Sequence, residues 1–123
     1  MIPAPKKIAC LKFVGVMTTN TLYADVNRIY DPLPGLQKFI GDLLFAGFKV
    51  VVYTEQVGVN AVVHWIQTHG ITGVSEVLDK KPKAEVYIDD CAVQFTGDYD
   101  AIVAQAIGFA PWWANKKAAK AKK

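Results

Sequence analysis

Short apolar runs of strand type alternate along this 123-residue chain with stripes of apolar residues at helical spacing. The runs cover residues 8–11, 49–54, 74–77 and 85–88. One helical stripe starts after Pro34-Gly35 and the next at Val59, and Gly47 and Gly70 stand where these helices should stop. Strands that alternate with helices predict a parallel sheet covered on both faces, so we expect an α/β fold: a single Rossmann-like domain whose central parallel sheet of four to five strands is flanked by helices.

The candidate site residues stand at the ends of the predicted strands. The first strand delivers Lys12 and Val14 to its carboxyl end, and a turn follows at Gly15. The second strand ends in Thr54, and the fourth ends in the acidic pair 89–90. We expect the first strand to be central, between the second and the fourth, so that these ends meet at one edge of the sheet.

A last helix is predicted after Asp98, whose side chain can cap its first turn. Its inner face should consist of Ile102, Val103 and Ala106.

Composition agrees with one globular domain that has a substantial core. Hydrophobic residues make up 52% of the chain, but none of its apolar runs approaches the ~20 residues that cross a bilayer. We therefore expect no membrane association. The N-terminus lacks the apolar stretch of a signal peptide, and Cys10 and Cys91 are too few for a disulfide framework. These features favour the cytoplasm or another reducing intracellular compartment.

The net charge of +3 arises at the C-terminal end. Residues 116–123 hold five lysines and no acid, and without them nine basic residues face eleven acidic ones. One interpretation is a solubilising tail, and the other is an electrostatic arm for nucleic acid or another anionic surface. The candidate interaction residues at this end are Trp112, Trp113, Lys116, Lys117, Lys120, Lys122 and Lys123.

The order of these motifs, with Val-Tyr-Ile-Asp-Asp at 86–90, Phe-x-Gly-Asp at 95–98 and Pro-Trp-Trp at 111–113, resembles the haloacid dehalogenase (HAD) superfamily and in particular its small capless members. The resemblance covers roughly residues 6–113. It implies a HAD-like domain over 1–113 and a lysine-rich tail over 114–123.

The resemblance also implies where catalytic residues should stand. In this family the first strand ends in Asp-x-Asp. The first Asp is the nucleophile and a Mg²⁺ ligand, and the second is the general acid/base. Lys12 and Val14 stand at these two positions. The family's Thr or Ser, its Lys and its metal-binding acids are matched by Thr54, Lys81, Asp89 and Asp90. Two arginines of related small members are replaced by Gln56 and Cys91.

These replacements remove the groups that phosphoryl transfer requires. An aspartyl-phosphate mechanism needs a carboxylate nucleophile, a bridging cation and an acid for the leaving oxygen. A protonated lysine has donors only, and valine cannot carry a proton. We expect no cofactor, no bound metal and no competent catalytic residue. The Lys12 ammonium should occupy the vacated cation site and pair with Asp89 or Asp90; if the protein were active, these two acids would hold Mg²⁺.

Each retained motif residue also has a structural interpretation. Thr54 can simply end a strand, Lys81 can belong to a solvated basic loop, and the acidic pair can form a turn. His64 and His69 are five residues apart, which does not match the i, i+4 spacing of a helical metal pair. The tryptophan pair either closes the domain or meets a partner.

Three functions follow as hypotheses. The first is a catalytically inactive HAD-fold protein that binds a protein partner within a larger assembly. The second is an Mg²⁺-dependent phosphatase or nucleotidase with an altered nucleophile, and the third is a nucleic-acid-associated protein that uses its basic tail. Deliberate inactivation would replace aspartate by asparagine or alanine and would leave Gln56 and Cys91 unexplained, so we favour an inherited loss of catalysis.

Overall fold

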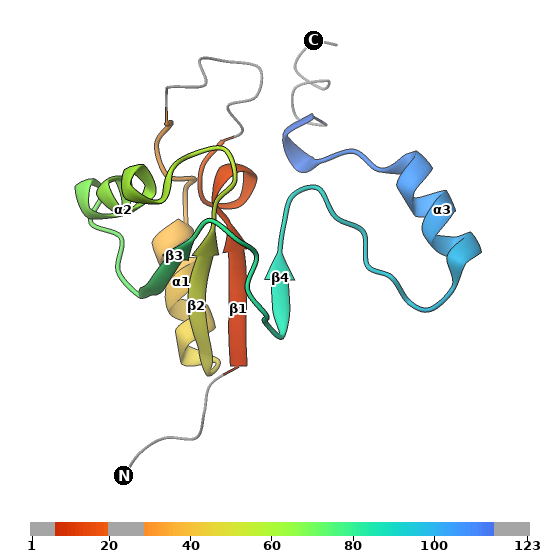
Figure 1. The fold of residues 1–123 in the computed structure, drawn as a ribbon, viewed down its shortest axis with the longest axis horizontal. Coiled ribbons are helices and arrows are strands. Elements are labelled where there is room, and N and C mark those ends of the chain that lie inside the picture. Colours follow the sequence, from red (N-terminus) through yellow and green to blue (C-terminus); the bar gives the residue numbers. More distant parts are fainter. Residues whose placement is uncertain (1–6, 20–28, 115–123) are drawn as a thin grey trace. The chain divides into compact units, whose positions relative to one another are not determined.

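The computed structural model describes residues 7–19 and 29–114 (Figure 1). Contacts within the chain divide it into two compact units, residues 1–88 and 89–123. The elements, in chain order, are β1 (Lys7–Lys12), the wide turn η1 (Phe13–Met17), α1 (Leu36–Phe45), β2 (Phe48–Tyr53), α2 (Val59–Thr68), β3 (Val74–Leu78), β4 (Val86–Ile88) and α3 (Tyr99–Gly108). In this described part, no helix is long and apolar enough to cross a membrane.

The sheet of the first unit has four parallel strands in the order β3-β2-β1-β4. The central position of β1 between β2 and β4 was predicted and is confirmed. Lys12 pairs with Tyr53 at the carboxyl ends of β1 and β2, and Leu11 pairs with Ile88 of β4. The fold is therefore an α/β fold with a central parallel sheet flanked by helices, as the sequence pattern indicated.

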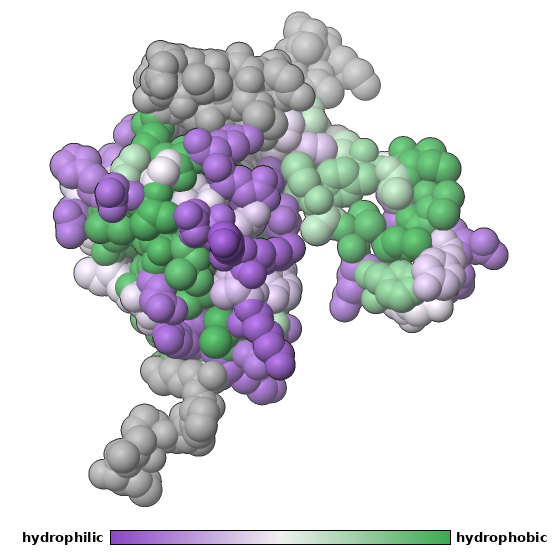
Figure 2. Space-filling model, viewed as in Figure 1, coloured by the Kyte–Doolittle hydropathy of each residue, from purple (hydrophilic) through white to green (hydrophobic). Residues whose placement is uncertain are grey.

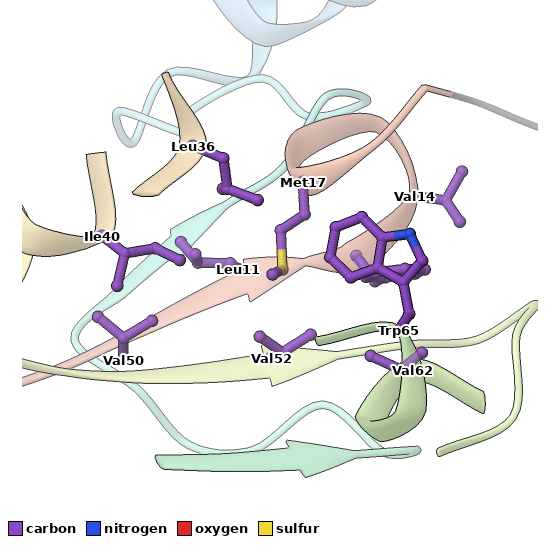
Figure 3. Close-up of a cluster of buried hydrophobic side chains, with 10 residues drawn as sticks. Leu11, Val14, Met17, Leu36, Ile40, Val50, Val52, Val62 and Trp65 are labelled. Atoms are coloured by element: carbon purple, nitrogen blue, oxygen red, sulfur yellow. The ribbon is translucent and has the colours of Figure 1, made fainter. Parts of the chain in front are cut away.

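The core of this unit lies between one face of the sheet and helices α1 and α2 (Figure 3). Alternate strand residues point to the same face, and helix residues three or four apart share a side. The buried set is Leu11, Phe13, Val14, Met17, Leu36, Ile40, Val50, Val52, Val62 and Trp65. Phe13 meets Trp65 edge to face, with ring centroids 4.9 Å apart at 87°.

The connection from β3 to β4 has no helix, because residues 79–85 are too few for a helical crossover. Instead, the loop is held against the ring of Tyr87 in β4. The Tyr87 hydroxyl donates to the carbonyl of Pro82 over 2.6 Å and accepts from the amide of Ala84 over 3.0 Å. The loop is thereby fixed beside the edge strand.

Glycine ends α2 where the sequence predicted a stop. Gly70 adopts φ 66°, its amide donates to Gln67, and the amide of Ile71 donates to the carbonyl of Ile66. These two hydrogen bonds satisfy the last carbonyls of the helix, and they require a left-handed backbone conformation at position 70. Gly73, at φ 99°, lies so close to α1 that an added Cβ would stand 2.7 Å from Leu44 Cδ1.

The second unit contains α3, and the predicted cap is confirmed because Asp98 Oδ1 accepts from the amide of Ala101 over 3.2 Å. The predicted inner face of α3 is wrong in part. Ile102 is half-buried, but Val103 is 56% exposed and none of the helix residues 99–108 is buried. The helix is apolar around most of its circumference, so the sequence does not mark one side as the inner one.

Candidate functional site

A small hollow lies at the carboxyl ends of β1 and β2, where the sequence placed the candidate site. Its free volume is ≈ 30 Å³, enough for a water-sized group. The hollow is lined by Lys12, Val14, Tyr53, Thr54, Glu55 and Gln56. Four of these residues were singled out from the sequence, and the parallel register of β1 and β2 brings them together.

The two positions that replace the expected aspartates have different surroundings. Lys12, the last residue of β1, is half-buried. Val14 is 6% exposed and belongs to the apolar core cluster. The end of β1 therefore offers an ammonium group and a packed isopropyl group, and it contributes no carboxylate to the hollow.

Thr54 has a structural role at the end of β2. It is 3% exposed, its amide donates to the carbonyl of Leu78 over 2.9 Å, and its hydroxyl donates to the carbonyl of Val57 over 2.7 Å. The hydroxyl proton is thus used to close the turn that leads to α2. This contact favours the interpretation of Thr54 as a strand terminator.

Glu55 lines the hollow, although the sequence analysis did not single it out. Its carboxylate accepts a hydrogen bond from the hydroxyl of Tyr53. The residue is exposed and directly follows Thr54. Its position next to a strand-end threonine was the signal that could have identified it.

The acidic pair after β4 belongs to the second unit, and both acids accept hydrogen bonds there. Asp89 Oδ1 accepts from the amide of Cys91 over 2.7 Å, which forms a local turn. Asp90 is 8% exposed, and its Oδ2 accepts from the indole nitrogen Nε1 of Trp113 over 2.7 Å. A buried carboxylate requires such donors, so this bond joins two motifs that the sequence presented separately.

The pairing of Lys12 with Asp89 or Asp90 stays a prediction. Lys12 lies in the unit 1–88 and both aspartates lie in the unit 89–123.

Lys81 is not among the residues that line the hollow. Its Nζ lies 4.7 Å from the ring centroid of Tyr87, a cation–π distance, and the residue is exposed. This position supports the interpretation as a surface loop residue.

The remaining candidates do not assemble into a metal site. His64 and His69 are exposed on and just after α2, and the ring of His69 lies 5.0 Å from that of Trp65. In residues 7–19 and 29–114, no cluster of three or more His, Cys, Asp and Glu side chains is placed to hold a metal ion. The candidate lysines 116, 117, 120, 122 and 123 lie outside the described residues.

Two buried polar side chains near this strand end were missed from the sequence. Thr18 Oγ1 donates to the carbonyls of Tyr30 and Asp31, over 3.0 and 2.9 Å. Trp65 Nε1 donates to the same Tyr30 carbonyl over 2.8 Å. These bonds anchor the segment that leads into α1 beside the core.

Comparison with known proteins supports the fold class. No protein-family model matches the chain, and no curated protein does. Among solved structures, a conserved protein from Bacteroides thetaiotaomicron is similar over 85% of this chain and 91% of its own, with a TM-score of 0.57 and 17% sequence identity. A similarity at this level of identity concerns the fold alone.

Proposed function

We propose that this chain is a HAD-like protein that has lost phosphoryl-transfer chemistry and serves as a binding or structural component of a larger assembly. The observation that carries the proposal is the pair of side chains at the end of β1. Lys12 and Val14 line the hollow where the resembled family has two carboxylates. An ammonium group repels Mg²⁺ and cannot act as a nucleophile while it is protonated.

The hydrogen bond of Thr54 supports the same proposal, whereas that of Asp90 does not decide it. The Thr54 hydroxyl donates to Val57 and so directs its proton into the protein. Asp90 is oriented by the indole of Trp113. A carboxylate oxygen has further lone pairs, so this bond restricts the direction of the Asp90 side chain without exhausting its acceptors.

An Mg²⁺-dependent phosphatase or nucleotidase is the alternative, and Glu55 is the observation that favours it. Its carboxylate lines the hollow beside Thr54 and could replace the missing nucleophile. The hydrogen bond from the Tyr53 hydroxyl weakens this alternative, because it stabilises the carboxylate charge and lowers its nucleophilicity.

Hydrolysis of an aryl phosphate in excess Mg²⁺ tests the proposal. We expect the wild-type protein to show no turnover above the buffer rate, as should the variants Asp89→Asn and Glu55→Gln. Turnover that disappears in Asp89→Asn would overturn the proposal. Turnover that disappears in Glu55→Gln would instead establish the altered-nucleophile alternative.

The predicted environment of Lys12 can be tested by its chemical reactivity. If the ammonium fills the vacated cation site, reductive methylation should modify Lys12 more slowly than Lys38, whose side chain is 81% exposed. Equal rates at the two lysines would remove this part of the proposal. Mass spectrometry of the labelled peptides measures both rates in one sample.

A further inference from the structure

We draw no further inference here: the strongest candidate, the apolar groove of about 210 Å³ between α2 and the edge strand β3 (Figure 2), carries nothing, because nothing in the described part of the chain shows what covers it.

Discussion

Residues 7–88 and residues 89–114 bury different kinds of side chain. In the first region, strands and helices enclose a continuous apolar cluster that includes Phe13 and Trp65. In residues 89–114, the one buried residue is Asp90, a carboxylate at 8% exposure. The first region has a sheet face and two helices to cover it, whereas a single helix and a turn have too little surface to enclose a core.

This difference determines what each region depends on. Apolar burial contributes roughly 25 cal/mol per Å² and is spread over many contacts, so the sheet region tolerates the loss of any one surface contact. A single hydrogen bond contributes about 0.5–1.5 kcal/mol. The C-terminal region therefore depends on a few specific interactions, such as the hydrogen bond from Trp113 to Asp90.

The largest effect is expected from Trp65→Ala. This change removes a side chain that packs edge to face on Phe13 and donates to the carbonyl of Tyr30, so it should cost about 3–5 kcal/mol of unfolding free energy. Urea denaturation measures the loss, with Phe45→Ala as the exposed control. A loss below about 1 kcal/mol would show that the cluster is not the main source of stability, because surface substitutions usually stay within about 0.5 kcal/mol.

Gly73→Ala should have the next largest effect within the sheet region. The backbone at φ 99° disfavours any side chain, and the new Cβ would stand 2.7 Å from Leu44 Cδ1, so we expect a loss of about 1–3 kcal/mol. Gly41→Ala is the matched control, since it lies within α1 with no atom within 4 Å of its added Cβ. The control should be neutral or stabilising. Equal effects at the two glycines would argue against the close packing of Gly73 on α1.

Trp113→Phe should act on the C-terminal region alone. The ring body is retained but the N–H that Asp90 accepts is lost, and the loss of one hydrogen bond to a buried carboxylate costs about 1–3 kcal/mol. Hydrogen exchange should accelerate in residues 89–114 and stay unchanged in the strands. Trp112→Phe is the control, because Trp112 is 36% exposed. Faster exchange throughout the sheet would show that Trp113 supports the whole chain.

The smallest effect is expected from Lys38→Gln on the surface of α1. Lys38 Nζ donates to Asp42 over 2.8 Å, and this hydrogen bond together with the Asp42 charge raises the Lys38 pKa above its ordinary value of 10.5. A raised lysine pKa stabilises the folded state below 10.5, and the contribution disappears as pH rises through the folded-state pKa. Because the pair is exposed, unfolding of wild type and variant should coincide at neutral pH within error. A resolved difference would assign this surface pair a role in the sheet region.

Periodicity explains why the sheet region was predictable from the sequence. The positions of the strands, Gly70 as a helix stop and Asp98 as a cap each depend on local patterns, and all three are confirmed. The bond from Trp113 to Asp90 joins residues 23 positions apart and has no local signal. Val103 was assigned to the inner face of α3. Because this helix is apolar on most sides, the spacing of its apolar residues does not identify which side is covered.

The candidate site was predictable in position and less so in detail. The register of the parallel strands brings Lys12, Val14 and Thr54 to one hollow. This agrees with the prediction from the sequence that the ends of these strands meet. The hydroxyl contact of Thr54 depends on the turn that follows β2, and the place of Lys81 depends on the ring of Tyr87. These details arise from loop conformations that apolar periodicity does not encode.

Residue-resolved hydrogen exchange of the full chain tests the contrast between the two regions most directly. The account predicts strong protection of β1 and β2, since their protection arises from the core of their own unit. It predicts weaker protection of α3, because the described part of the second region buries one carboxylate and encloses no apolar core. Protection of α3 equal to that of β1 would contradict the account.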